Sequence, residues 1–288
     1  MEYEKPTSLA GAISLLKQGG AGARAMGGGT DLVVQIREGR RTVDLLVDIK
    51  AVPEATAVQW SSAGLHLGAA VPCYRIYQDG TIASHYPGLI DSASLIGGTQ
   101  IQSRAGLGGN LCNASPAADS IPTLIALGAT CNIVGPNGNR TLPVEQFCTG
   151  PGQNALQPGE LLVSFDFPTP AAHSGAFFLR FIPRNEMDIA VVNAAAAITL
   201  DADQRHIAGA RLAVGAVAPT PLLIGGVAEA LAGQPVDAPD LEPAMALARA
   251  AAKPITDMRG SAKQRVHLSG VLAKRALEGA LARARSAA

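Results

Sequence analysis

The first part of the chain alternates between apolar positions at helical spacing and short, continuously apolar runs. Residues 9–16 show the helical spacing, and Thr7 or Ser8 is suited to cap the helix that this spacing predicts. The runs "ARAM" (23–26) and "TVDLLVDI" (42–49) are too apolar for an exposed face and predict buried strands. The N-terminal part therefore mixes helices with strands.

The next hundred residues continue this mixture. Two runs around a Ser-Ser-Ala-Gly turn, within residues 55–71, predict a hairpin, and residues 73–97 are mostly helical with a break near Pro87. The polar, glycine-rich stretch "GLGGNLCNASPAADS" (106–120) then leads into "IPTLIALGA" (121–129), which predicts a buried helix. Strands around a Pro-Asn-Gly turn and an apolar strand ending in prolines complete this part.

After Pro170 the pattern changes to long strands and then to helices. Three strand-rich segments follow one another, at 174–182, 188–203 and 207–224. Helical patterns occupy the rest, ending in the long segment 260–285. These patterns predict an α+β unit made of a three-stranded sheet followed by helices. We place the domain boundary after residue 172, which gives domains at 1–172 and 173–288.

Composition narrows the class of protein. Charged residues make up 16% of the 288 residues, against a typical share of roughly 25%. Two readings account for this: other subunits cover part of the surface, or the sequence carries an Ala- and Gly-rich bias. The formal net charge is zero and no basic stripe is present, which argues against nucleic acid as a partner. The sequence also has no secretory signal and no apolar run near the roughly 20 residues of a membrane span, so we expect a cytoplasmic protein.

Metal sites are not indicated by the sequence. The four cysteines contain no C-x-x-C pair, and the five histidines show no spacing typical of metal ligands. We therefore expect neither an iron–sulfur cluster nor a zinc site in this chain, and we interpret the cysteines as small buried hydrophobic residues.

Two glycine-rich turns are the candidate ligand-binding features. "GGGT" (27–30) follows a strand, and "GLGGN" (106–110) precedes a helix, so both can direct backbone N–H groups at an anion. Neither matches the G-x-x-x-x-G-K-[ST] or G-x-G-x-x-G pattern. Each alone is more typical of a structural turn, whereas the pair favours a dinucleotide. No nucleophile–base pair is visible, so chemistry here requires a bound cofactor.

Three other polar residues have two readings each. Asp188 is either a functional carboxylate or the cap of a turn. Arg180 and Arg184 either supply positive charge near a ligand or lie solvated on the surface, which is the commoner place for arginine.

Five segments now identify a family resemblance: "MGGGTDL", "LGGNLCNASPAADSIPTLIALGA", "RFIPRNEMDIAVVN", "VAPTPLLI" and "DMRGSAKQRVHLSGVLAKRAL". In order and spacing, the chain resembles the FAD-binding medium subunit of molybdenum hydroxylases, the xanthine dehydrogenase and carbon monoxide dehydrogenase family, over nearly its whole length. The resemblance implies an α+β fold. An FAD-binding domain of the vanillyl-alcohol-oxidase (PCMH) type, with two α/β subdomains, would precede a C-terminal three-stranded antiparallel sheet with a helical bundle.

The resemblance also implies a role and partners. FAD in this chain would take electrons from two 2Fe–2S clusters of a small subunit, in a complex whose large subunit holds the molybdenum cofactor. The complex would be a dimer of heterotrimers, and the electrons would leave to an external acceptor such as NAD, oxygen, a quinone or a cytochrome. Two alternatives remain: a self-sufficient flavin oxidase of the same fold, and a redox-inactive nucleotide-binding assembly subunit.

The cofactor-binding positions that the resemblance implies fall in both glycine-rich segments and beyond them. They are Met26, Gly27, Gly28, Gly29, Thr30, Asp31, Leu32, Gly106, Gly108, Gly109, Asn110, Asn113, Ser115, Asp119, Leu162, Arg180 and Ile189. No residue of this chain is expected to be catalytic or to bind a metal.

The chain departs from the family pattern at several of these positions. Arg180 stands where relatives have a lysine near the isoalloxazine ring, and its positive charge would favour the anionic reduced flavin. Ile189 stands at a position that packs against the flavin, where some relatives have tyrosine. Gly106 replaces a threonine, which removes one hydroxyl contact to the diphosphate. The extra 4Fe–4S insertion of some relatives is absent.

Overall fold

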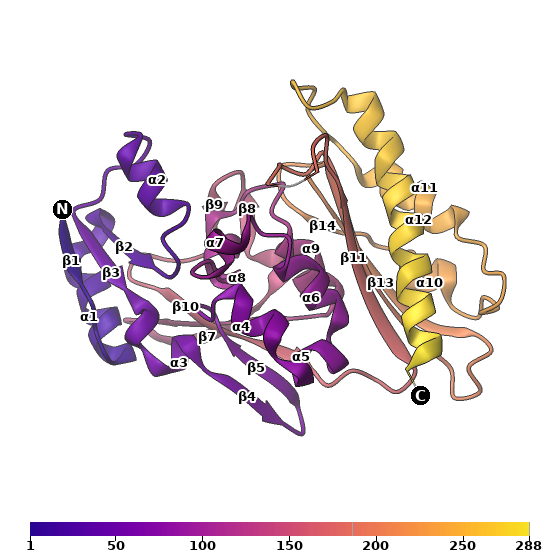
Figure 1. The fold of residues 1–288 in the computed structure, drawn as a ribbon, viewed down its shortest axis with the longest axis horizontal. Helices are drawn as coiled ribbons and strands as arrows, with labels where there is room; N and C mark the ends of the chain where they lie inside the picture. Colours follow the sequence, from indigo (N-terminus) through magenta and orange to yellow (C-terminus); the bar gives the residue numbers. More distant parts are fainter. Residues whose placement is uncertain (186, 288) are drawn as a thin grey trace.

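The computed structural model describes residues 1–185 and 187–287 (Figure 1). Its N-terminal subdomain is a parallel sheet with the strand order β1-β3-β2. Its elements are β1 (Glu2–Glu4), α1 (Leu9–Gly19), η1 (Gly20–Gly22), β2 (Ala23–Met26), α2 (Leu32–Arg37), β3 (Leu45–Asp48), η2 (Ile49–Ala51) and α3 (Pro53–Thr56). The N-cap prediction is confirmed for Ser8, whose Oγ accepts a hydrogen bond from the N–H of Gly11 at 3.2 Å.

A second subdomain contains an antiparallel sheet with the strand order β4-β5-β10-β6-β7. Its strands are β4 (Val58–Ser61), β5 (Gly64–Gly68), β6 (Thr130–Gly135), β7 (Gly138–Pro143) and β10 (Leu161–Pro168), with the small pair β8 (Cys148–Gly150) and β9 (Gln153–Asn154) beside it. Its helices are α4 (Cys73–Gln78), α5 (Gly80–His85), α6 (Pro87–Ala93), α7 (Thr99–Gln102), α8 (Leu107–Asn113), α9 (Ser120–Ala126) and η3 (Val144–Gln146). The predicted hairpin is confirmed as β4–β5.

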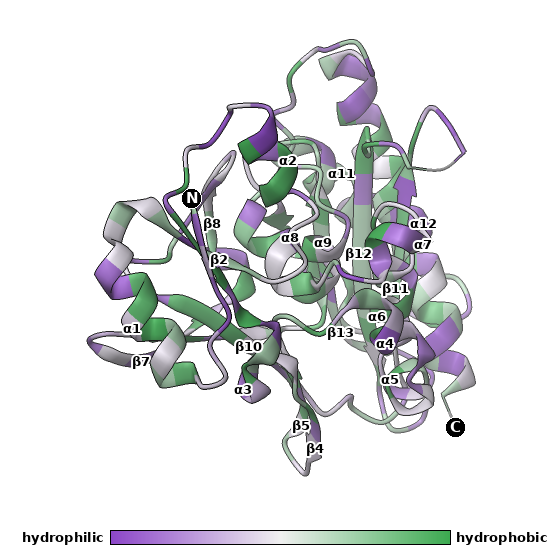
Figure 2. Cartoon of the chain, turned by 60° about the vertical axis from the view of Figure 1, so that its left-hand side comes forward, coloured by the Kyte–Doolittle hydropathy of each residue, from purple (hydrophilic) through white to green (hydrophobic). Residues whose placement is uncertain are grey.

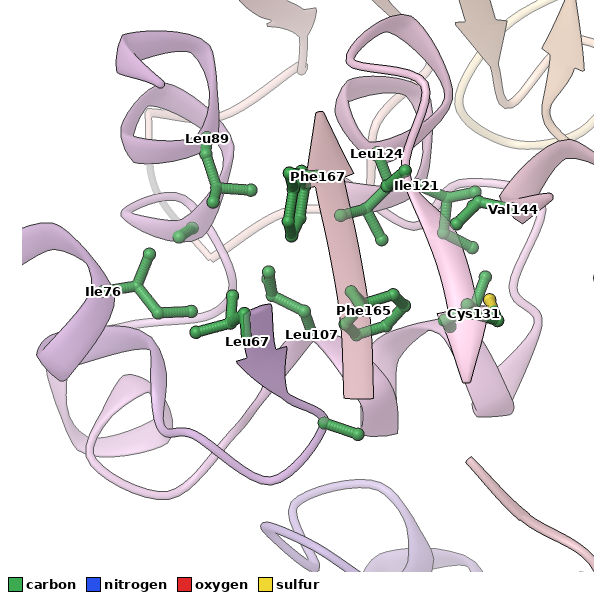
Figure 3. Packing of buried hydrophobic residues seen from close by; sticks show 14 of the residues in the cluster. Leu67, Ile76, Leu89, Leu107, Ile121, Leu124, Cys131, Val144, Phe165 and Phe167 are labelled. Carbon is green, nitrogen blue, oxygen red and sulfur yellow. The ribbon is translucent and has the colours of Figure 1, made fainter. Parts of the chain in front are cut away.

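The core of this subdomain lies between the sheet and its helices. Figure 3 shows Phe165 and Phe167 of β10 surrounded by apolar side chains from the helices, including Leu89 and Leu124. Phe165 and Phe167 are two residues apart in β10, so their side chains lie on the same face of the sheet, where they are almost fully buried. Asp166 between them lies on the opposite face and is exposed. In Figure 2 the buried strands are coloured mainly as hydrophobic, whereas much of the hydrophilic colour lies on loops and outer helix faces.

The C-terminal unit is an antiparallel sheet with the strand order β11-β12-β13-β14. Its elements are β11 (Ser174–Phe181), β12 (Val192–Leu200), β13 (Ile207–Gly215), β14 (Leu222–Leu223), α10 (Val227–Leu231), α11 (Glu242–Ala251) and α12 (Ala262–Ser286). The three predicted strands and the helices after them are confirmed. The short strand β14 was not predicted. It forms because the end of the third apolar segment folds back and pairs with β13.

Both faces of this sheet are covered. The long helix α12 packs on β11 and β12 from one side, and α6 and α9 of the preceding subdomain pack from the other (Figure 1). Ala194 and Ala196 of β12 contribute to the core under α12, whereas Ala195 packs with Ala126 of α9. A strand buried on both faces carries no polar alternation, which accounts for the continuous run "AAAA".

None of the helices in residues 1–185 and 187–287 is both long enough and apolar enough to cross a membrane.

Candidate functional site

A cavity of about 1030 Å³ lies where the two N-terminal subdomains and the C-terminal sheet meet. The loop after β2, helix α8 with the loop that follows it, and the β11–β12 loop all contribute to its wall. The predicted positions that line it are Met26, Gly27, Gly28, Gly29, Thr30, Asp31, Leu32, Gly106, Gly109, Asn110, Asn113, Ser115, Asp119, Leu162, Arg180 and Ile189. Tertiary structure thus brings together residues from four distant parts of the sequence.

The first glycine-rich segment connects β2 to α2. Within the described part of the chain, the N–H groups of Gly28, Gly29 and Thr30 donate no hydrogen bond to a protein acceptor. Gly29 has φ 77°, a left-handed conformation that favours glycine. A Cβ on Gly28 would lie 2.5 Å from the backbone oxygen of Arg104, so glycine is required where the two segments approach. The Arg104 side chain fixes the same contact, because its Nε donates to the Gly28 oxygen at 3.2 Å.

The second segment differs from its prediction. Residues 106–110 do not form a turn ahead of a helix: Gly106 is the N-cap of α8, and Gly108, Gly109 and Asn110 lie inside that helix. The physical reason is packing. A Cβ on Gly108 would lie 2.5 Å from the Cβ of Ala69, so the missing side chain lets the helix lie against the subdomain core.

Adjacent glycines of α8 have different surroundings. Gly108 is buried, donates its N–H to the Ala69 oxygen at 3.0 Å, and is absent from the cavity wall. Gly109 is exposed to the cavity, and a Cβ built on it meets no atom within 4 Å. Gly106 is also buried, and a Cβ there would lie 2.8 Å from the Val71 oxygen. The glycine that replaces threonine at position 106 therefore fits its surroundings without a shift of the Val71 carbonyl.

Two asparagines of α8 are oriented by their amide oxygens. Asn110 Oδ1 accepts from Ser120 Oγ at 2.7 Å, and Asn113 Oδ1 accepts from Gln35 Nε2 at 2.9 Å. The second bond crosses from α8 to α2 and joins the two subdomains at the cavity wall. Neither Nδ2 group donates to an acceptor among the residues that the structure describes, so both remain available as donors to a ligand.

Arg180 and Asp119 form an ion pair at the cavity wall, with Nη1 and Oδ2 2.5 Å apart. The two side chains are only 6% and 12% exposed. Burial raises the pKa of Asp119 to about 6, although the Arg180 charge and its hydrogen bond act in the opposite direction. The cavity wall therefore presents an ion pair at Arg180, because the Asp119 carboxylate lies directly against the guanidinium.

The β11–β12 loop supplies an apolar residue and a structural carboxylate. Ile189 lines the cavity with 51% of its surface exposed. Asp188 accepts hydrogen bonds from the N–H groups of Arg184 and Ile189, and the Arg184 side chain holds the pKa of Asp188 below its usual range. This geometry matches the interpretation of Asp188 as the cap of a turn and of Arg184 as a solvated surface residue.

Many residues of the cavity wall were not predicted from the sequence, and the polar ones among them include Arg24, Gln35 and Arg41. Arg24 lies two residues before Met26 in β2, the strand that leads into the first glycine-rich segment, so the two side chains share a face of the strand. This spacing is the signal in the sequence that could have identified Arg24.

The cysteines are free thiols. Cys112 lines the cavity, and burial raises the pKa of its thiol to about 12, which keeps the thiol neutral. Among the residues that the structure describes, no group of three or more His, Cys, Asp or Glu side chains is arranged to hold a metal ion.

The sequence matches two protein-family models. The model described as the FAD binding domain in molybdopterin dehydrogenase matches residues 1–170, and that described as the CO dehydrogenase flavoprotein C-terminal domain matches residues 177–280. The chain therefore belongs to the FAD-binding subunits of molybdenum hydroxylases, which are oxidoreductases. This confirms the family resemblance, the fold class and FAD as the cofactor.

Individual relatives are similar over their whole length. The xanthine dehydrogenase FAD-binding subunit of Escherichia coli O157:H7 is 32% identical over 98% of this chain and 96% of its own. The carbon monoxide dehydrogenase medium chain of Afipia carboxidovorans is 30% identical over 99% of this chain and 98% of its own. A solved structure of a Cu,Mo-CO dehydrogenase, in its cyanide-inactivated form, superposes with a TM-score of 0.93 at 30% identity and 98% coverage of both chains.

Proposed function

We propose that this chain is the electron-transfer subunit of a heteromeric molybdenum hydroxylase, taking electrons from 2Fe–2S clusters of a partner subunit to FAD and on to an external acceptor. The observation that carries the proposal is the cavity wall. The N–H groups of Gly28, Gly29 and Thr30, which have no acceptor in residues 1–185 and 187–287, lie in the same cavity as exposed Gly109. Such N–H groups suit the diphosphate of a dinucleotide, and the lack of a side chain at Gly109 leaves room for it.

FAD, when bound, would accept two electrons in single-electron steps. The residues of the chain bind and orient it. Backbone donors of the first glycine-rich segment and the Nδ2 groups of Asn110 and Asn113 hold polar parts of the cofactor. The apolar side chain of Ile189 packs against the flavin. The Arg180–Asp119 pair presents a nearly neutral group beside the ring, with guanidinium donors fixed by the carboxylate.

The proposed assembly follows the subunit names of the relatives and the low content of charge. We expect a large subunit with the molybdenum cofactor and a small subunit with two 2Fe–2S clusters, arranged as a dimer of heterotrimers. A charged content of 16% is consistent with a surface that other subunits cover in part. We also propose cytoplasmic localisation and a division into domains at 1–172 and 173–288. This division lies between the end of β10 at Pro168 and the start of β11 at Ser174.

The experiment is purification of the chain alone, followed by cofactor analysis and substrate tests. We expect stoichiometric FAD, no turnover of N-heterocycles, aldehydes or carbon monoxide, and flavin reduction only when the cluster subunit and the large subunit are added back. Substrate-driven flavin reduction by the isolated chain would instead indicate a self-sufficient flavin oxidase. A chain that binds FAD but accepts no electrons in the reconstituted complex would indicate the redox-inactive assembly subunit.

A further inference from the structure

The last of the five family segments, residues 257–277, contains a buried arginine that the proposed function does not use. Arg265 lies near the start of α12, is 4% exposed and does not line the cavity. Its Nη1 donates to the backbone oxygens of Val191 at 2.8 Å and Ala216 at 3.1 Å, and its Nη2 donates to Asp257 Oδ1 at 2.8 Å. One guanidinium group thus joins three segments that are far apart in the sequence.

The stability of α12 does not account for an arginine at this position. Ser261 is the N-cap of the helix, and its Oγ accepts a hydrogen bond from the N–H of Gln264 at 3.2 Å. Arg265 therefore lies about one turn from the helix N-terminus, where the helix dipole disfavours a positive charge. Burial adds a desolvation cost, which the Asp257 carboxylate and two carbonyl oxygens offset. The contacts of Arg265, rather than the helix itself, explain its place.

The first contact fixes the base of the β11–β12 loop. The N–H of Val191 donates to the Phe181 oxygen at 2.9 Å, and the Val191 oxygen accepts from Arg265. This loop carries Ile189, which lines the cavity two residues before Val191. In the part of the loop that the structure describes, the side-chain hydrogen bonds stay within the loop itself. Arg265 therefore ties the loop that carries Ile189 to α12.

The second contact connects Arg265 to the loop after α8. The N–H of Ala216 donates to the Pro116 oxygen at 2.6 Å, and the Ala216 oxygen accepts from Arg265. Ala216 has φ 64°, a left-handed conformation that is uncommon for a residue with a side chain and needs support from its surroundings. Pro116 lies between Ser115 and Ala117, which both line the cavity. Arg265 thus sets the β11–β12 loop relative to a second loop of the cavity wall.

The third contact orients the guanidinium group. Asp257 Oδ1 accepts from the N–H of Arg259 at 2.9 Å as well as from Arg265, and the backbone of Asp257 pairs with that of Gly260 in a tight turn. The Arg259 N–H and the Arg265 guanidinium hold the pKa of Asp257 below its usual range. A charged hydrogen bond from a fixed turn therefore holds Arg265 in the orientation that reaches both carbonyl oxygens.

We propose that Arg265 is a positioning residue that holds the β11–β12 loop in place and thereby presses Ile189 against the flavin ring. This inference rests on the proposed function, since it takes the ligand to be FAD and Ile189 to pack on its ring. Arg265 lies outside the cavity and acts through the Val191 oxygen. The planar guanidinium group suits this role, because it donates in fixed directions to several acceptors, which an ammonium group does not.

The test compares Arg265→Met with Arg249→Met in the full-length protein. Arg249 of α11 is the matched control, because it is a partly buried arginine that pairs with a carboxylate, Glu242, and does not line the cavity. We expect Arg265→Met to bind FAD and riboflavin about three- to tenfold more weakly, which corresponds to the partial loss of one apolar contact. Arg249→Met should bind both within about twofold of the unchanged chain.

ADP, which has no flavin ring, separates the loop from the rest of the cavity. In Arg265→Met the hydrogen bond from Ala216 to Pro116 is retained, so the loop after α8 stays in place. ADP should therefore bind this variant within about twofold of the unchanged chain. In an Ile189→Ala background, Arg265→Met should weaken FAD binding by less than about twofold, because the side chain through which Arg265 acts is shortened.

Hydrogen exchange of the apoprotein measures the position of the loop without a ligand. Peptides that cover residues 181–192 should exchange faster in Arg265→Met than in the unchanged chain, because Val191 has lost its bond to α12. The same peptides should exchange at the unchanged rate in Arg249→Met. Arg265→Lys keeps the charge with fewer fixed donors, so its FAD affinity should lie between those of the unchanged chain and Arg265→Met.

Three results would overturn the inference while the proposed function stands. The first is FAD and riboflavin binding by Arg265→Met as tight as that of the unchanged chain. The second is an equal loss for FAD and ADP, which would indicate a generally distorted cavity. The third is the same loss of FAD affinity with and without Ile189→Ala.

Two further outcomes are decided by the same measurements. If Arg265→Met does not fold, Arg265→Lys takes its place: weaker binding of FAD and riboflavin with unchanged ADP binding supports the inference, and unchanged binding of all three overturns it. An unchanged chain that binds no FAD would overturn the proposed function. Hydrogen exchange in residues 181–192 would then still show whether Arg265 fixes the loop.

Discussion

Gly108 and Gly109 are neighbours in one helix, and the absence of a side chain does different things at the two positions. At Gly108 it lets α8 lie against Ala69, and at Gly109 it leaves the cavity open. A glycine-glycine pair in a ligand-binding motif is therefore not two copies of the same contact. The difference arises because successive residues of a helix point about 100° apart.

Substitution of Gly109 tests the cavity side of this pair. We expect Gly109→Leu to fold, because the site is open in the protein, and to bind FAD at least about tenfold more weakly, because the new side chain occupies the cavity. FAD retention after gel filtration and a fluorescence titration measure this. Gly80→Leu is the control, since Gly80 is also exposed and has no atom within 4 Å of a Cβ. Unchanged FAD affinity in Gly109→Leu would exclude Gly109 from the binding wall.

The burial of Asp119 makes the stability of the protein depend on pH, and the charge of Arg180 opposes this effect. The folded-state pKa of Asp119, about 6, is above its ordinary value of 3.8, so the folded protein binds this proton more tightly than the unfolded chain does. The resulting contribution to stability is fully present below pH 3.8 and is lost as the pH rises through about 6. Arg180→Met removes the positive charge that lowers the pKa of Asp119, so this pKa rises further. Stability is then lost up to a higher pH than in the unchanged chain.

We therefore expect Arg180→Met to lower the melting temperature more at pH 8 than at pH 5. The loss in melting temperature at pH 8 should exceed the loss at pH 5 by several degrees. In a protein of about this size, each kcal/mol of lost unfolding free energy lowers the melting temperature by about 2–4 °C. Thermal unfolding of the apoprotein at both pH values measures it. Arg40→Met removes an exposed pair with Glu38 and should change little. An equal loss at both pH values in Arg180→Met would mean that Asp119 does not titrate in this range.

At the scale of elements, the C-terminal sheet depends on close contact with α12. A Cβ on Gly175 of β11 would lie 2.4 Å from the backbone nitrogen of Ala284, and one on Gly279 of α12 would lie 2.5 Å from the Phe177 ring. Small residues on both sides allow a long helix to lie directly on the sheet. The run of alanines in β12 has the same cause, because helices cover both of its faces.

Gly175→Ala tests this contact against a matched position. We expect it to destabilise the protein by about 1–3 kcal/mol, because the clash is with helix backbone, which cannot rotate away. Gly209→Ala, in β13 of the same sheet, meets no atom within 4 Å and should be neutral or stabilising by up to about 1 kcal/mol. Denaturant unfolding of the two variants measures the difference. Equal effects would show that α12 is free to move away from β11.

At the scale of the whole molecule, a few charged contacts join the C-terminal unit to the helices of the preceding subdomain. Arg283 of α12 makes two hydrogen bonds to the carboxylate of Asp91, at 2.5 and 2.8 Å, and lies 4.7 Å from the centre of the Phe177 ring. The Asp91 carboxylate also accepts from the N–H of Phe178 at 3.1 Å. The Arg180–Asp119 pair makes a second such connection at the cavity. The site therefore depends on how these parts dock.

Arg283→Met should weaken this docking. We expect a loss of about 1–3 kcal/mol, since a bidentate, half-buried pair is broken and Asp91 loses its charged partner. Cleavage at the connection 169–173 in limited proteolysis should become faster. Lys274→Met, which breaks an exposed i,i+4 pair with Glu278 on the same helix, should stay within about 0.5 kcal/mol of the unchanged chain. Similar losses in both variants would argue against Arg283 as a docking contact.

The sequence allowed much of the fold to be predicted because its elements are local. The Ser8 cap, the β4–β5 hairpin, the long strands after residue 173 and the final helix all follow from periodicity and turn residues within short windows. The short helix α8 was missed because glycine and asparagine are poor helix formers. Tertiary contacts stabilise it, including the close packing of Gly108 on Ala69 and the burial of Leu107 and Leu111 in the core. Tertiary packing overrides propensity at that point.

The sequence by itself determined which segments can carry a cofactor, since glycine patterns and a family resemblance are properties of residues in order. Only the tertiary structure decided what those residues do. It placed Gly108 behind the cavity wall, set Asp119 against Arg180, and added Arg24 and Arg41 to the same wall. Charge pairing and cavity lining join residues far apart in the chain. Their effects depend on distance and burial in space, and no local sequence pattern encodes either quantity.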